Sequence, residues 1–349
     1  MKARLKVPIM IFSMIFLFSC GGYKTRVVNT ILEDGSITRK VVMQNNKDEF
    51  LPDKYRIPVD STWNIEFTME IEDEDTTWFL SAEKHFDSVK ELNDSYDKDT
   101  GSNKELPRSA SFSKQFRWFN THYRFSENID QTLNVDCKLS EFYKGEELSF
   151  FYLPNEVQEE LKNGPDSLNY RELSDSLETI YEYWLFTGLA REWVEIFYDN
   201  FETHQGLTIS REEMRTKIPF FTEQLILDEL DEEETFRKIL GEDFYDSFKT
   251  EIDSSFTILN DLLEVYWEMD KYDIEIRMPG EILASSGYVS TGDSIQEKGI
   301  LWTVTGDYFL GQPYEMWAES QIINYWAWVL TGIFIIFVAA GLLYQRRKQ

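Results

Sequence analysis

The sequence predicts an α+β fold: an antiparallel β module built from both chain ends, a helical insertion, and one C-terminal transmembrane helix. Three observations support it. Period-two runs of β-branched and aromatic residues occur before position 138 and again after position 271. Between 154 and 270, apolar residues instead recur every three or four positions. Residues 326–344 contain no charged side chain. The order of strands, helices and strands makes this the simplest arrangement.

Residues 1–19 have the pattern of a secretory signal peptide. Three basic residues precede an apolar run from Val7 to Phe18, and this run is shorter than the roughly 20 residues that span a bilayer. The run ends in Leu17-Phe18-Ser19-Cys20, which resembles the lipobox of bacterial membrane-anchored lipoproteins. This resemblance implies that residues 1–19 are a lipoprotein signal peptide and that Cys20 is the lipidated (palmitate-bearing) first residue of the mature chain. The alternative is an ordinary signal peptide with an incidental cysteine.

Residues 20–153 form the predicted N-terminal β-rich part. It opens with two β-branched runs on either side of Asp34-Gly35, a strong hairpin signal. A polar, turn-rich stretch at 93–111 is predicted to be an exposed loop. The further predicted strands are 63–71, 76–82, 112–118, 121–127 and 131–137.

Residues 154–270 form the predicted helical insertion. Apolar side chains such as Trp184 and Trp193 lie three or four positions from their neighbours, which indicates one apolar stripe on a long amphipathic helix. A second such set follows in 244–266. Stripes of this kind normally form a core, and the alternative is a ligand groove between the helices.

Residues 271–320 form the predicted C-terminal β part that completes the sheet. Strands are predicted at 272–278, 281–285 and 299–305, with a turn at Pro279-Gly280. Since both ends of the mature chain are predicted to attach to one membrane, we expect the β module near that membrane and the helices farther out.

One family resemblance comes from this part of the chain. The residues Arg277-Met278-Pro279-Gly280-Glu281-Ile282, then Ser286-Gly287 and Leu301-Trp302, resemble a Pro-Gly…Gly…Trp hairpin of LppM-like lipoproteins. In those proteins a small β domain precedes one C-terminal transmembrane helix. The resemblance implies a lipid-facing or partner-facing β module without known catalysis. The helical insertion departs from the family, and Ser286 stands where Asn is expected.

Residues 325–344 are predicted to be a transmembrane helix. Trp326 and Trp328 at one end and Tyr344 at the other mark the two membrane interfaces. The basic residues Arg346, Arg347 and Lys348 lie in the tail 345–349, which is therefore predicted to be cytoplasmic. A helical span belongs to the inner membrane, because outer-membrane proteins are barrels. The body is then periplasmic.

Charge limits the partners of the body. The chain has 35 Lys+Arg and 63 Asp+Glu, and three basic residues lie at each end, so the remainder carries a net charge of −34. A field of this sign repels phosphate backbones, which excludes nucleic acid as an expected partner. Basic proteins, peptides and divalent cations are permitted. The simplest interpretation is that the negative charge keeps the body soluble.

The sequence contains two cysteines. Once Cys20 is lipidated, Cys137 is the only thiol left, so an intramolecular disulfide is impossible in the mature chain. Cys137 is predicted to be a small buried residue.

Recognisable catalytic and metal-binding motifs are absent from the sequence, and no cofactor is expected. Asp97 and Asp99 resemble the start of a calcium loop, but Ser102 and Arg108 occupy the positions of its Gly and Glu. A solvated turn is the alternative. Catalysis by a pair of carboxylates stays possible, because a chain with 63 acidic residues brings some pair to catalytic distance by chance.

The sequence thus predicts an inner-membrane-anchored extracytoplasmic lipoprotein of the cell envelope. It is expected to be a non-catalytic binding or scaffold protein for an envelope protein or lipid. The alternative is a carbohydrate hydrolase that uses two carboxylates about 5–10 Å apart, in a cleft flanked by Trp or Tyr.

Overall fold

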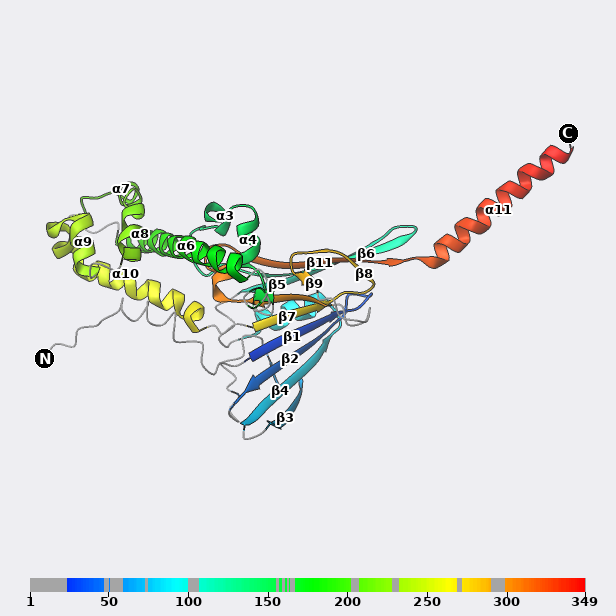
Figure 1. The fold of residues 1–349 in the computed structure, drawn as a ribbon, viewed down its shortest axis with the longest axis horizontal. Coiled ribbons are helices and arrows are strands. Elements are labelled where there is room, and N and C mark those ends of the chain that lie inside the picture. Colours follow the sequence, from blue (N-terminus) through cyan, green and yellow to red (C-terminus); the bar gives the residue numbers. More distant parts are fainter. Residues whose placement is uncertain are drawn as a thin grey trace.

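The computed structural model describes residues 24–46, 50, 59–72, 75–99, 107–154, 157–158, 161, 163, 167–201, 207–227, 232–268, 272–289 and 299–348. The predicted signal peptide and Cys20 lie outside these ranges, so both stay predictions. The fold class is confirmed: the body is α+β, with two open sheets, an inserted set of helices and an apolar C-terminal helix (Figure 1).

The larger sheet, sheet A, joins the two ends of the body. Its strand order is β3-β4-β2-β1-β7-β10-β9. The strands are β1 (Lys24–Ile31), β2 (Ile37–Asn45), β3 (Asn64–Glu72), β4 (Asp75–Phe86), β7 (Tyr272–Arg277), β9 (Tyr288–Val289) and β10 (Ile300–Val304). The central pair β1–β7 is parallel and the other pairs are antiparallel. Parallel strands need a long crossover connection. Here the chain between residues 31 and 272 forms that connection.

The smaller sheet, sheet B, has the antiparallel order β5-β6-β11-β8. Its strands are β5 (Arg108–Phe116), β6 (Asn120–Ile129), β8 (Glu281–Ser285) and β11 (Tyr314–Ile323). The chain changes from sheet A to sheet B at the predicted Pro279-Gly280 turn. Gly280 has a φ of 80°, and a Cβ there would lie 2.2 Å from the carbonyl oxygen of Gln321. Only glycine fits this corner.

The sheets and helix α2 (Val89–Asp97) enclose one hydrophobic core, and α2 packs against β5. The Asn93 side chain fixes that contact, since it accepts from the Ala110 N–H at 2.7 Å and donates to the Ala110 carbonyl at 2.9 Å. Trp302, on β10, is buried in the core.

The helices form an arm with its own core. The two long helices are α6 (Ser167–Phe201) and α10 (Glu242–Glu268). The shorter ones are α3 (Leu139–Phe142), α4 (Glu146–Phe151), α7 (Arg211–Arg215), α8 (Ile218–Leu227) and α9 (Glu232–Leu240). As predicted, the side chains of Trp184 and Trp193 on α6 are buried, together with those of Phe244 and Ile252 on α10.

One of the contacts between the arm and the β body is a carboxylate that binds both long helices. Asp307 lies in the 3-10 helix η4 (Gly306–Phe309), between β10 and β11. Its Oδ1 accepts from the hydroxyl of Tyr181 on α6 at 2.5 Å and from that of Tyr266 on α10 at 2.6 Å. Burial and the nearby Asp307 charge raise the pKa of both tyrosines well above the ordinary value, so both remain donors.

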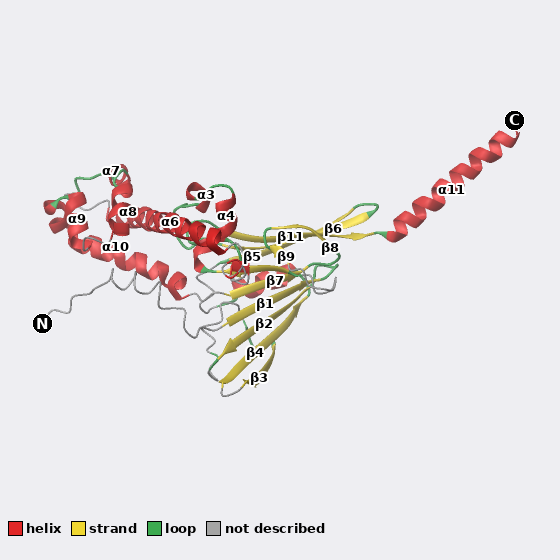
Figure 2. Ribbon diagram, viewed as in Figure 1, coloured by secondary structure: helices red, strands yellow, loops and turns green. Residues whose placement is uncertain are grey.

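The last helix, α11 (Tyr325–Lys348), projects from the β body at the end opposite the arm (Figures 1 and 2). It is long and apolar enough to cross a membrane, and almost none of it is buried against the body.

Three local predictions need correction. Residues 131–137 are not a strand: the N–H groups of Thr132, Leu133 and Cys137 instead donate to carbonyls in 309–311. The predicted loop 93–111 begins inside α2 and ends inside β5. Strand β11 was missed, and it continues to Ile323, past the predicted boundary at 320.

Candidate functional site

The junction between β11 and α11 is the first feature that bears on function. Asn324 alone separates the strand from the helix. Its backbone N–H donates to the Phe119 carbonyl at 2.9 Å, and its side-chain amide donates to the Arg117 carbonyl, also at 2.9 Å. Its Oδ1 accepts from the Thr121 hydroxyl at 3.2 Å. A connecting residue whose polar groups are bonded in this way holds the helix in a fixed direction.

Two of the residues that hold Asn324, Arg117 and Phe119, belong to the turn between β5 and β6. We call residues 116–119 (Phe-Arg-Trp-Phe) the aromatic tip. The Phe116 ring stacks on Trp326 with centroids 6.2 Å apart, and the Phe119 ring lies 4.3 Å from that of Trp328. The tip therefore packs along the first turns of α11.

Trp118 extends this contact farther along the helix. Its ring meets Trp326 edge-on at 5.4 Å, and its Nε1–H donates to the Thr331 hydroxyl at 2.9 Å. Thr331 is the seventh residue of α11, so the tip reaches well into the apolar helix.

The tip is unusual in both exposure and charge. Phe116 remains 57% exposed and Trp118 48% exposed despite their contacts. Residues 106–125 contain Arg108, Lys114, Arg117 and Arg124 but no Asp or Glu, in a chain of net charge −28. Contiguous exposed apolar surface marks an interaction site, and here it lies in a locally basic stretch.

The predicted membrane-interface residues lie as follows. Trp326 and Trp328 lie on the first turn of α11, where they are partly exposed and contact the aromatic tip. Tyr344 is exposed near the other end, followed by the exposed Arg346 and Arg347. Lys348 is the last residue of the helix. The helix thus carries aromatic residues near both ends and basic residues after one of them.

Sequence reasoning missed the tip, although a signal was present. A turn between two strands normally consists of Gly, Pro, Asn, Asp or Ser. The turn at 116–119 instead holds three aromatic residues and an arginine. Large apolar side chains where turn chemistry calls for polar ones indicate a surface that contacts something other than water.

A second exposed apolar surface lies on β3, at the edge of sheet A. We call it the β3 stripe, and every one of its side chains is exposed. It consists of Ile65, Phe67, Met69 and Ile71. The residues between them, Glu66, Thr68 and Glu70, are also exposed on the opposite face. The outer edge of such a strand is open to pairing with a further strand, which charged side chains oppose.

The sheets that carry these two surfaces are linked by an ion pair inside the core. Arg39 on β2 donates to Glu127 on β6 at 2.6 Å, and both side chains are 1% exposed. Arg39 also donates to Asn29 at 2.7 Å and to the Tyr96 hydroxyl, which in turn donates to Glu127 at 2.8 Å. Burial raises the pKa of the Tyr96 hydroxyl, so it stays protonated as the donor to Glu127. Each charged group of the pair is thus hydrogen-bonded to more than one partner.

Cys137 is free and buried, as predicted. The indole N–H of Trp184 donates to the Cys137 carbonyl at 2.8 Å. Burial raises the pKa of the thiol to about 11, so it is protonated and unreactive at neutral pH.

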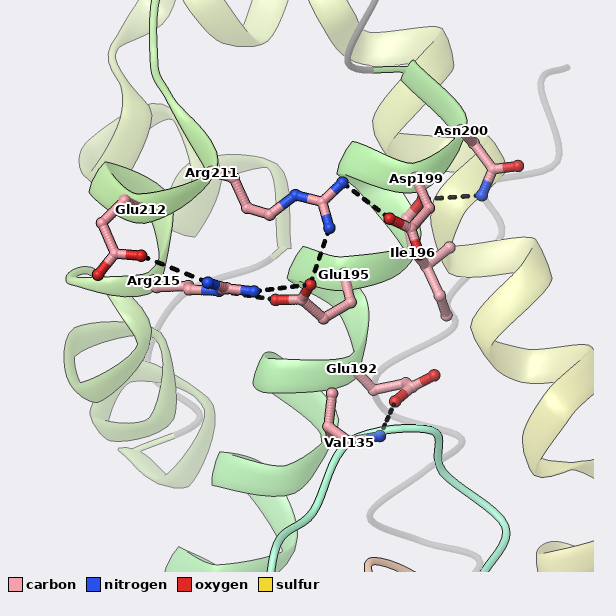
Figure 3. A network of polar contacts seen from close by, with 9 residues as sticks. All are labelled: Val135, Glu192, Glu195, Ile196, Asp199, Asn200, Arg211, Glu212 and Arg215. Carbon is pink, nitrogen blue, oxygen red and sulfur yellow. Dashed lines mark hydrogen bonds and ion pairs between the residues drawn. The ribbon is translucent and has the colours of Figure 1, made fainter.

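The carboxylates of α6 serve as clamps (Figure 3). Glu192 is buried and accepts from the backbone N–H groups of Asn134 and Val135, both at 3.0 Å. Glu195 accepts from Arg211 at 3.0 Å and from Arg215 at 2.8 Å. Such contacts hold loops and helices together, and both carboxylates are already bound to groups of the protein.

A shallow hollow of about 400 Å³ lies on the arm. It is lined by Glu233, Glu234, Arg237, Lys238 and Glu242, and these five include no aromatic residue. Arg237 pairs with Glu233 at 2.8 Å and with Glu242. The hollow therefore does not favour the hydrolase alternative, which requires stacking Trp or Tyr beside two carboxylates.

The calcium candidates lie at the end of α2. Asp97 is its exposed last residue and Asp99 follows two positions later, while residues 100–106 lie outside the described ranges. Within the part of the chain that the structure describes, no group of three or more His, Cys, Asp or Glu could hold a metal ion. The calcium site stays a prediction.

Comparisons with known proteins add little. No family model matches the chain, and no curated protein matches it. Among solved structures, it is similar to the folded domain of LppM from Mycobacterium tuberculosis, at 8% identity and a TM-score of 0.26, over 88% of this chain and 95% of that one. The two are only slightly alike at this TM-score, so the resemblance read from Pro279-Gly280, Ser286-Gly287 and Trp302 stays a prediction.

Proposed function

We propose that this chain is a bacterial lipoprotein of the inner membrane whose body lies on the periplasmic side and holds a protein or lipid partner without catalysis. The Asn324 junction is the observation that supports this most. A scaffold must keep its binding surfaces at a set height and orientation. A strand that enters the membrane helix through one fully bonded residue provides this, whereas a flexible linker would leave the body free to turn.

The proposed topology rests on charge and on the N-terminal signal. Arg346 and Arg347 follow the apolar helix, and basic residues beside a span remain in the cytoplasm. A lipid on Cys20 lies on the outer face. Residues 21–324 then lie outside, and one crossing satisfies both anchors.

The arm sets the reach of the proposed scaffold. Helix α6 has 35 residues, which at 1.5 Å per residue is about 52 Å. The arm lies at the end of the body opposite α11 (Figure 1). A partner bound on the arm would therefore be held far from the bilayer.

The orientation is tested by loosening the junction. A Gly-Ser-Gly-Ser insertion after Asn324 is compared with the same four residues appended after Gln349. A fluorophore at Thr250→Cys on α10 reports energy transfer to acceptor lipids in vesicles. We expect a narrow distance distribution for the native chain and the appended control, and a broad one for the insertion. Equal distributions in all three chains would contradict a fixed orientation.

The two anchors are tested separately. We expect Cys20→Ala to lose palmitate labelling, while the protein still resists carbonate extraction because α11 remains. Protease added to intact spheroplasts should digest the body of the native protein. A body that survives this treatment would place it on the cytoplasmic side and refute the topology.

A further inference from the structure

We propose that the aromatic tip is a third membrane contact: Phe116, Trp118 and Phe119 enter the outer interface of the bilayer, and Arg117 meets the lipid phosphates. The inference rests on the proposed function, because it requires α11 to span the membrane. It adds a site on the folded body itself, distant in sequence from both anchors.

The depth of the tip follows from its contact with α11. Trp118 donates to Thr331, six residues after Tyr325. At 1.5 Å per residue this is about 9 Å along the helix. The headgroup layer on each side of a bilayer is only about 5–8 Å thick. If α11 enters the membrane at its first aromatic residues, the Trp118 ring reaches the boundary between headgroups and acyl chains.

The hydrogen-bonding pattern suits that depth. An indole N–H that lost its water would be costly in lipid, and Thr331 supplies its partner. The carbonyls of Arg117 and Phe119 accept from Asn324, and the Arg117 N–H donates to the Asn120 carbonyl at 2.8 Å. The turn can therefore leave water with these backbone groups satisfied, while the exposed phenyl rings gain apolar contact.

Charge selects lipid as the occupant of this surface. The body is strongly acidic and repels anionic headgroups. Arg117 is exposed at the tip, with Lys114 exposed three residues before it. A long basic side chain beside aromatic rings can extend to the phosphate layer while the rings sit below it. The tip is also continuous with the bare apolar surface of α11, which the lipid must cover.

The test measures the depth of the tip in the full-length protein. A nitroxide is placed at Arg117→Cys or, as control, at the exposed Ser109→Cys at the far end of β5. The buried Cys137 thiol does not compete for the label. The protein is reconstituted into vesicles of phosphatidylethanolamine and phosphatidylglycerol. We expect oxygen to relax the label at 117 more than a water-soluble nickel chelate does, with the reverse at 109.

A matched substitution tests whether the aromatic rings drive insertion. Phe116→Gln should shift the label at 117 toward the aqueous response. Phe67→Gln, which makes the same change at a similarly exposed position on β3, should leave it unchanged. An aqueous response at 117 in a carbonate-resistant protein would overturn the inference and leave the proposed function intact. Release of the protein by carbonate would instead refute the spanning helix, and the inference with it.

Discussion

The aromatic tip and the β3 stripe are two exposed apolar surfaces in different surroundings. Phe116 on the tip and Phe67 on the stripe are 57% and 64% exposed. The tip lies in a stretch without acidic residues and is bonded to α11. The stripe alternates with Glu66 and Glu70 on an edge strand paired only with β4. The comparison shows that exposure alone does not identify a partner. The charge of the neighbouring residues and the element to which the surface is attached indicate which partner it binds.

The two surfaces also differ in how firmly they are held. The tip is fixed by hydrogen bonds and ring contacts to Asn324, Trp326, Trp328 and Thr331. The stripe belongs to sheet A, which is joined to sheet B through the buried pair Arg39–Glu127. The position of the stripe relative to the tip therefore depends on this ion pair between the sheets.

The largest effect is expected from Arg39→Met. It leaves Glu127 buried without its ionic partner, which should cost about 3–5 kcal/mol of folding free energy. Denaturant unfolding of the full chain in detergent measures this cost. The double variant Arg39→Met with Glu127→Leu should recover most of the loss, because neither member of the pair is then left buried without the other. A double variant as unstable as the single one would show that the cost lies in packing.

A smaller effect is expected from Asn324→Ala. It removes the side-chain bonds to Arg117 and Thr121, and buried bonds of this kind are worth about 1 kcal/mol each. The energy-transfer distribution between the arm and the membrane should broaden. Thr121→Val removes one of the same bonds and should broaden it less. Equal distributions for Asn324→Ala and the native chain would show that the ring contacts alone hold the junction.

A pH-dependent effect is expected at the parallel seam of sheet A. Burial alone would raise the pKa of Glu275 on β7, but hydrogen bonds from Arg277 and Arg26 outweigh it and hold the pKa below the ordinary 4.5. The carboxylate therefore stabilises the fold above that value, and the contribution is lost as the pH falls through the lowered pKa. Glu275→Gln should be less stable than the native chain at neutral pH and converge with it in acid. A stability gap that does not vary with pH would argue against this.

The elements that are determined by residues close together in the sequence could be predicted. Asp34-Gly35 sets the β1–β2 hairpin, because the Asp34 carboxylate accepts from the Ser36 N–H at 3.0 Å and Gly35 adopts a φ of 91°. The apolar stripes of α6 and α10 follow from their spacing. One such local signal was overlooked: Ser88 is the N-cap of α2, and its hydroxyl accepts from the Glu91 N–H at 3.3 Å.

The rest depends on contacts between distant residues. Residues 131–137 alternate like a strand, but Glu192, more than fifty positions away, accepts two of their backbone N–H groups. Strand β11 contains Glu, Ala, Ser and Gln among its aromatic and β-branched residues, and its buried Met316, Ala318 and Ser320 lie between the neighbouring strands β6 and β8. The tip is defined as a site by its contacts with α11, which lies about 200 positions away in the sequence.

The smallest effect is expected from the paired change Glu66→Gln and Glu70→Gln on β3. Two chains that met antiparallel at this edge would bring like charges together, so these carboxylates oppose self-association. Their removal should raise the dimer fraction of the detergent-solubilised protein in light scattering, and added salt should reduce the difference from the native chain because it screens the same repulsion. The matched pair Glu315→Gln and Glu319→Gln, on β11 inside sheet B, should leave the dimer fraction unchanged. If the β3 variant stays monomeric, the stripe has no tendency to pair, and its exposure would carry no more weight than that of any single surface phenylalanine.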